Sequence, residues 1–111
     1  MCIGTPLQVV EPEDRFAWCE DDQQRERLDM ALVGSQPAGT WVLAFHGAAR
    51  QVLSAQEAAQ ARAGRRALEA VLAGQGNVDH FFADLVGRVP ALPAHLVPTQ
   101  AQPAMPQENS A

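Results

Sequence analysis

Short stretches of alternating apolar and polar residues fill the first half of the chain and predict β-strands. Successive side chains of a strand point to opposite faces, so Phe16 and Trp18 are expected on one face of their strand. The third stretch is expected to point three apolar side chains inward: Leu28, Met30 and Leu32. Turn-rich segments separate the stretches, which are 7–11, 15–20, 25–33, 40–45 and 49–53. Five short strands joined by such turns predict a small OB-like β-barrel, so the fold class is mainly β with C-terminal helices.

A helical pattern replaces the strand pattern at Ser54. The sequence Ser54-Ala55-Gln56-Glu57 has the form of a capping box, in which Ser54 and Glu57 satisfy free backbone amides at a helix start. The alanine-rich stretch that follows is expected to be helical as far as Ala73, with Gly74 ending it. Its polar side carries three arginines that are expected to face solvent: Arg62, Arg65 and Arg66.

A second, shorter helix is expected over 77–86, with Asn77 as its cap and Gly87 after its end. Five prolines follow among the last 24 residues, so this part is expected to be extended and mobile. The predicted organisation is therefore a barrel with an N-terminal cysteine motif over 1–53, helices packed beside it over 54–87, and a proline-rich tail over 88–111.

The composition limits the function classes. The 111 residues are enough for one modest core, and 13 acidic against 8 basic residues give a net charge of −5. This balance argues against binding to a phosphate backbone. No apolar run approaches the roughly 20 residues that span a bilayer, and no secretory signal is visible. We therefore expect a cytoplasmic protein without membrane insertion, in which Cys2 and Cys19 stay reduced.

Cys2 is the residue with the most distinctive chemistry. Removal of Met1 would leave an α-amine and a thiol on the same residue, and the neighbouring ammonium would favour the thiolate. Thiolate is the form that binds metals and attacks electrophiles. The residues alone leave two interpretations open: a working thiol, or a cysteine that has no role at this position.

Three segments resemble the HypC/HupF/HoxL family of [NiFe]-hydrogenase assembly chaperones. The start Met-Cys-Ile-Gly-Thr-Pro, continued as far as Val9, is similar to the family's N-terminal signature. Segment 27–34 resembles its "LVG" strand, and segment 39–43 resembles its "G-x-W/Y-V-L" strand. The resemblance covers roughly residues 1–73. The C-terminal extension is more like the HupF/HoxL branch, specialised helpers of one uptake hydrogenase that work when oxygen is present.

The resemblance implies a chaperone without enzymatic turnover that binds the Fe(CN)2(CO) fragment and delivers it to the immature hydrogenase large subunit. A HypD-type scaffold protein is the other implied partner. Cys2 would be the iron ligand, because low-valent iron bearing cyanide and carbonyl is soft and thiolate is a soft ligand. The fragment would be a transient cargo, and no permanent cofactor is expected. Docking to partners is assigned to four residues of the signature: Cys2, Ile3, Gly4 and Pro6.

The second metal-binding position of the family is less clear in this chain. The family has a histidine in the pattern "W-V-L-V-H-x-G", whereas here Phe45 takes that place and His46 follows it. In a regular strand this offset sends the side chain to the opposite face, and a bulge at Gly47 would restore its direction. His46 is thus either a displaced ligand of the iron fragment or an ordinary core or surface histidine. His80 and His95 lie outside the match and are expected to be incidental, and Cys19 is expected to be a packed or surface thiol.

An alternative function from another class is a single-stranded nucleic-acid-binding module, because OB-like barrels often bind single strands. Such a module needs exposed aromatic rings within a basic groove. The chain is acidic and offers few aromatic residues: Phe16, Trp18, Trp41, Phe45, Phe81 and Phe82. The alternative therefore has less support than the chaperone hypothesis.

Overall fold

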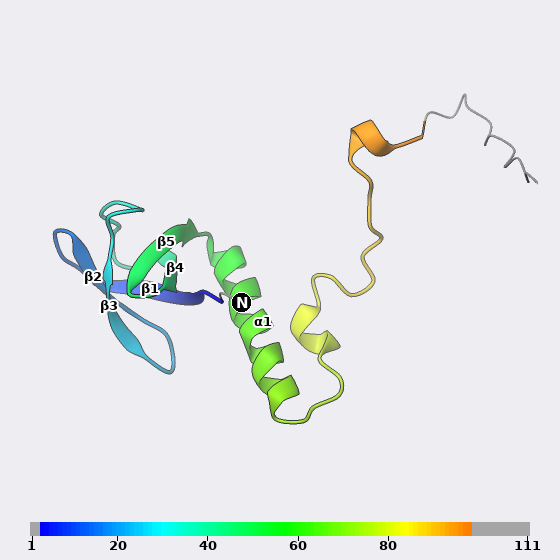
Figure 1. Cartoon of the computed structure of the whole chain (residues 1–111), viewed down its shortest axis with the longest axis horizontal. Coiled ribbons are helices and arrows are strands. Elements are labelled where there is room, and N and C mark those ends of the chain that lie inside the picture. The colour runs from blue at the N-terminus through cyan, green and yellow to red at the C-terminus, as the bar shows by residue number, and fades with distance from the viewer. Residues whose placement is uncertain (1–2, 99–111) are drawn as a thin grey trace, which may run out of the picture.

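The computed structural model describes residues 3–98, and its first half is a closed five-stranded barrel (Figure 1). The strands follow the order β1-β2-β3-β5-β4 around the barrel, and β4 pairs back onto β1. The β3–β5 pair is parallel and the other pairs are antiparallel. The strand bounds are Thr5–Pro12 for β1, Phe16–Glu20 for β2, Arg25–Asp29 for β3, Trp41–Phe45 for β4 and Ala48–Leu53 for β5. The predicted five-stranded, OB-like fold is confirmed.

The barrel interior is filled by one cluster of small and medium apolar side chains. Alternation along β2 turns Ala17 and Cys19 inward and places Phe16 and Trp18 together on the outer face. The sequence pattern predicts that the two rings share a face but does not say which face it is. Small residues allow the barrel to close tightly around the larger ones. The buried cluster consists of Leu7, Val9, Ala17, Cys19, Leu28, Met30, Val42, Ala44 and Ala49.

Strand β3 is shorter than the predicted stretch 25–33, and this corrects the placement of Leu32. The strand ends at Asp29, because the Asp29 carboxylate accepts a hydrogen bond from the Ala31 backbone N–H at 2.9 Å and turns the chain. The carbonyl of Met30 then accepts bonds from the N–H groups of Val33 and Gly34. Met30 still points into the core, whereas Leu32 lies in the turn and is 65% exposed.

Helix α1 (Ala55–Leu72) has the start and the end that the sequence predicts. The Ser54 hydroxyl accepts a hydrogen bond from the Glu57 backbone N–H at 3.1 Å. At the other end Gly74 has a φ of 94°, and its N–H bonds to the Val71 carbonyl while the next N–H bonds to Ala70. These two bonds form a Schellman motif, which satisfies the last carbonyls of the helix. The helix packs on the outside of β1, β4 and β5.

The expected second helix is a single 3₁₀ turn, η1 (Asp79–Phe82), rather than an α-helix over 77–86. The Asn77 side chain accepts a bond from the Asp79 N–H at 3.0 Å, so the predicted cap is formed. Phe82 lies against α1 at Gly64, and the chain then leads away from the barrel to another short 3₁₀ turn, η2 (Ala94–Leu96) (Figure 1). Residues 99–111 of the predicted tail lie outside the described residues. Within 3–98, none of the helices has the length and apolar character needed to cross a membrane.

The two leucines near the end of β3 provide a test of this strand boundary. Leu28→Ala removes a fully buried side chain and is expected to lower the free energy of unfolding by about 2–5 kcal/mol. Leu32→Ala, the matched change at an exposed position, is expected to alter it by less than about 0.5 kcal/mol. Urea unfolding followed by circular dichroism measures both values. A comparable loss in both variants would place Leu32 in the core and contradict the strand end at Asp29.

Candidate functional site

A shallow pocket of about 200 Å³ opens at one end of the barrel, beside the start of the chain. Three elements supply its walls: the segment that leads into β1, the first half of β3, and the β4–β5 hairpin. The residues that line it are Ile3, Thr5, Glu26, Ala44, Phe45 and His46. Ile3 is bonded directly to Cys2, so the pocket adjoins the residue that the sequence singles out. Cys2 itself lies outside the described residues.

His46 occupies a two-residue turn between β4 and β5, not a strand position. Its φ is 51° and that of Gly47 is 73°, and positive φ at both central residues is the mark of a type I′ hairpin turn. The question of which strand face His46 takes therefore does not arise, and Gly47 forms no bulge. The irregularity of this hairpin lies at Arg50, which has no partner residue on β4.

Two contacts hold this turn in place: a backbone hydrogen bond from β3 and the packing of the His46 ring on Phe45. The Asp29 backbone N–H donates to the Gly47 carbonyl at 2.9 Å, which ties the turn to the end of β3. The imidazole of His46 stands edge-on to the Phe45 ring, with centroids 4.2 Å apart. His46 is exposed, and it lines the same pocket as Ile3. The imidazole is therefore available at the site as a donor for a metal-bearing ligand.

The docking residues of the signature have different surroundings. Ile3 is 42% exposed, which is compatible with contact to a partner. A Cβ atom on Gly4 would lie 2.6 Å from the Leu43 side chain, so this position requires glycine for close approach to β4. The side chain of Pro6 is buried. The structure thus gives Gly4 and Pro6 packing roles in leading the chain onto the barrel, and their part in docking stays a prediction.

Glu26 is a pocket residue that the sequence analysis did not identify. It shares the inner face of β3 with Leu28, whereas its neighbours Arg25 and Arg27 point outward and pair with glutamates of the β1 end at 2.8 Å each. An acidic residue at the inward position of an alternating strand is the signal that could have revealed it. Glu26 is half-buried as a residue and lines the pocket.

Cys19 is a packed thiol, as expected. Its side chain is fully buried, and its Sγ donates to the Ala17 carbonyl at 3.7 Å. Burial raises the pKa of the Cys19 thiol to about 11, and the negative charge of Glu26 adds to the increase. The thiol is therefore neutral at physiological pH and poorly reactive.

The aromatic rings on the outside of the barrel are covered by guanidinium groups. Arg27 lies 4.1 Å from the Phe16 ring centroid and Arg25 lies 5.2 Å from that of Trp18, and both arginines are also paired with carboxylates. Arg62 of α1 lies 5.3 Å from the Trp41 ring centroid, and Arg50 of β5 lies 5.9 Å from that of Phe45. Rings in such contacts are not free platforms for stacked bases. This arrangement does not support the nucleic-acid-binding alternative.

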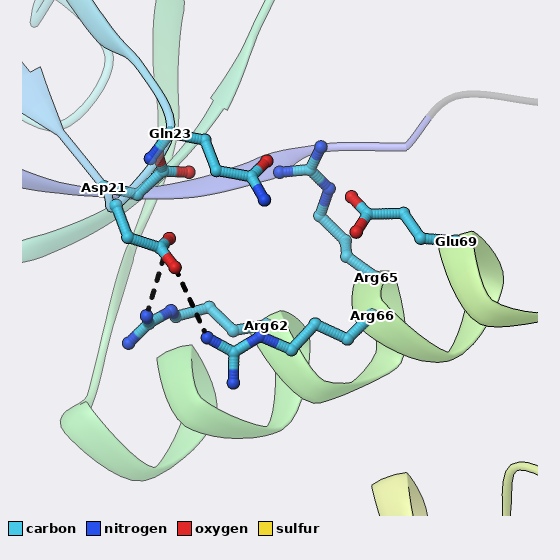
Figure 2. Close-up of a pocket in the computed structure, with 7 residues that line it drawn as sticks. Asp21, Gln23, Arg62, Arg65, Arg66 and Glu69 are labelled. Atoms are coloured by element: carbon cyan, nitrogen blue, oxygen red, sulfur yellow. Dashed lines mark hydrogen bonds and ion pairs between the residues drawn. The ribbon is translucent and has the colours of Figure 1, made fainter.

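A second hollow lies between α1 and the β2–β3 turn (Figure 2). Arg62 and Arg66 approach the Asp22 carboxylate at 3.8 and 3.6 Å, and Arg65 points into the same space. All three were expected to face solvent: Arg66 is exposed, as predicted, whereas Arg62 and Arg65 are half-buried beside the hairpin. Asp21, Asp22 and Glu69 balance their charge, so the hollow is an ion-pair contact rather than an anion site.

Comparison with known proteins identifies the family. The HupF/HypC family matches residues 1–64, which include the cysteine motif and the whole barrel. The chain belongs to the HupF/HypC family. It is 46% identical over 111 residues to the hydrogenase expression/formation protein HupN of Azotobacter chroococcum mcd 1, a match that covers 99% of both chains. The recognition of the family from the sequence is confirmed.

Two further relatives carry the names of the branch that the C-terminal extension indicates. The hydrogenase expression/formation protein HoxL of Azotobacter vinelandii is 44% identical, over 86% of this chain and 91% of its own. The hydrogenase expression/formation protein HupF of Bradyrhizobium diazoefficiens is 40% identical, over 86% of this chain and 97% of its own. These matches extend beyond the barrel into the segment after α1.

The burial of Cys19 predicts a difference between native and unfolded protein in thiol labelling. At pH 8 only about one in a thousand Cys19 thiols is ionised in the native state, against about a quarter at the ordinary thiol pKa of about 8.5. Iodoacetamide followed by peptide mass mapping should therefore label Cys19 more than about 100-fold faster in urea than in the native protein. Equal rates in the two conditions would show that the thiol is exposed and reactive.

Proposed function

We propose that this protein is an assembly chaperone of [NiFe]-hydrogenase maturation that carries the Fe(CN)2(CO) fragment on Cys2 and delivers it to the immature large subunit. Membership of the HupF/HypC family and the names of the relatives support the role in hydrogenase formation. The observation that supports the assignment to Cys2 is the pocket at the barrel end, which Ile3 and His46 both line.

The position of this pocket suits the handover of a metal fragment. The cysteine precedes the barrel and is attached to it through Ile3 and Gly4, so its sulfur can enter a cleft of a partner that an interior side chain such as Cys19 cannot reach. Thiolate is a soft ligand and binds soft iron. Delivery would then be an exchange in which the iron–sulfur bond to Cys2 breaks as a donor of the large subunit binds the iron.

His46 supplies the second donor in this proposal. A neutral imidazole is a common ligand of iron, and the turn holds it at the pocket rim with little freedom of the backbone. Glu26 and Thr5, which line the same pocket, are hard oxygen donors and are less suited to the fragment. We assign the docking contacts to a HypD-type scaffold and to the large subunit, and the site of action to the cytoplasm.

The test of the proposal is infrared spectroscopy of the protein purified from hydrogenase-producing cells. The wild-type protein should show cyanide and carbonyl stretching bands, and Cys2→Ala should lose them together with hydrogenase activity. Cys19→Ala is the matched control, because it removes the other thiol of the chain and should keep both. Active hydrogenase in cells that carry only the Cys2→Ala form would overturn the proposal.

A substitution can separate the proposed binding of the iron fragment by His46 from the part that His46 plays in the hairpin turn. His46→Asn keeps a residue that tolerates positive φ, so the hairpin and the free energy of unfolding should stay within about 0.5 kcal/mol of the wild type. The variant lacks the imidazole, and we expect its infrared bands to shift in frequency or fall several-fold in intensity. Bands identical to those of the wild type would assign His46 to the turn alone.

A further inference from the structure

Thr5 brings a hydroxyl group to the pocket at the end of the barrel. It is the first residue of β1 and lies on the same face of that strand as Leu7 and Val9, which are buried in the core. Its partner in the ladder is Ala44 of β4, which also belongs to the pocket lining. Alternation along two paired strands therefore directs Thr5 and Ala44 to the same opening of the barrel.

The Thr5 hydroxyl is available for binding. Among residues 3–98, none of the side-chain hydrogen bonds involves it, whereas Gln8 of the same strand donates to the Gly39 carbonyl at 3.1 Å. Thr5 is half-buried, and no side-chain oxygen in this part of the chain is both buried and without a partner, so the hydroxyl is accessible. A hydroxyl donates one hydrogen bond. Thr5 thus presents an unused donor to a molecule in the pocket.

The other five described residues of the lining offer no comparable side-chain donor. The ionised carboxylate of Glu26 only accepts hydrogen bonds. When one ring nitrogen of His46 binds a metal, its second N–H group points away from that metal. The rest of the lining is apolar and consists of Ile3, Ala44 and Phe45. The pocket therefore combines one hydroxyl donor, one carboxylate that repels anions, and an apolar surface.

The size of the pocket suits a small metal fragment better than an organic cofactor. Its volume is about 200 Å³, below the roughly 300–1,000 Å³ of pockets for organic ligands. The ligands of Fe(CN)2(CO) differ in chemistry, because each cyanide is anionic and its nitrogen accepts hydrogen bonds, whereas the CO oxygen is a poor acceptor. Hydrogen bonds to a charged acceptor are roughly twice as strong as those between neutral groups. A single donor in the pocket can therefore distinguish cyanide from CO.

We propose that the Thr5 hydroxyl donates a hydrogen bond to the nitrogen of one cyanide and thereby sets the orientation of the fragment in the pocket. The oxygen of threonine is a poor ligand for soft iron, but its O–H group can bind the outer end of a ligand that the iron carries. The negative charge of Glu26 keeps the cyanides away from β3, and the apolar part of the lining receives the CO ligand. This inference rests on the proposed function, which brings the fragment to this pocket.

Infrared spectroscopy of the protein purified from hydrogenase-producing cells tests the contact directly. Thr5→Val replaces the hydroxyl by a methyl group and keeps a β-branched residue that suits a strand. We expect the cyanide bands of this variant to shift by several wavenumbers and its CO band to move less, because the lost bond was made to a cyanide. In D2O the wild-type cyanide bands should shift as the hydroxyl proton exchanges, and those of Thr5→Val should not. The isotope shift of the wild type needs no substitution, so the test does not depend on the stability of a variant.

Two further variants make the result specific. Thr5→Ser keeps the hydroxyl and should retain the wild-type cyanide frequencies. Thr40→Val is the matched control and should leave all bands unchanged. It makes the same exchange at the other threonine of the described chain, which is also half-buried but lies directly before β4 and outside the pocket lining. Circular dichroism should show the same fold in all three variants.

The outcomes separate this inference from the proposed function. Cyanide bands that are present in the wild type but unchanged in Thr5→Val would overturn the hydrogen bond and leave the carrier role intact. An equal shift in Thr40→Val, or wild-type bands that do not respond to D2O, would also overturn it alone. Absence of cyanide and CO bands from the wild-type protein would overturn the carrier role and the inference together. Cyanide bands that shift in Thr5→Val and not in the other two variants support both.

Discussion

Closure of the barrel between β3 and β5 is the constraint on which the site depends. The two strands share a single residue pair, Asp29 with Ala48, and the backbone bond from Asp29 to Gly47 extends it into the turn. So short a parallel contact is sufficient only because β4 and β5 are joined by a tight two-residue hairpin that presents Ala48 in register. The same turn places His46 at the barrel end, so the hairpin that closes the barrel also supplies part of the pocket lining.

The sequence predicted the elements whose signals are local. Alternation located the strands, and Ser54 and Gly74 located both ends of α1, because each acts through hydrogen bonds within a few residues. The end of β3 was missed for a related reason. The pattern continues in phase to Leu32, but the Asp29 carboxylate offers the chain a turn that competes with the strand.

The candidate site was only partly predictable. Resemblance to a family identified Cys2 and directed attention to His46, but the strand argument for His46 was wrong because His46-Gly47 is a turn sequence. A histidine can adopt positive φ, and a following glycine makes the pair suitable for a type I′ turn. The sequence marks Glu26 only as an acidic residue at an inward strand position, and the barrel fold is needed to bring it to the same pocket as Ile3 and Thr5.

The distribution of charge explains why no arginine of the barrel lines the pocket. Arg15, Arg25 and Arg27 are each held by a ring and a carboxylate, as Arg25 is by Trp18 and Glu11. Such paired guanidinium groups stay extended over the surface and do not turn into the pocket. The inward carboxylate of Glu26 therefore meets no arginine from its own strand. The fold instead brings the start of β1 and the His46 turn to the pocket that Glu26 lines.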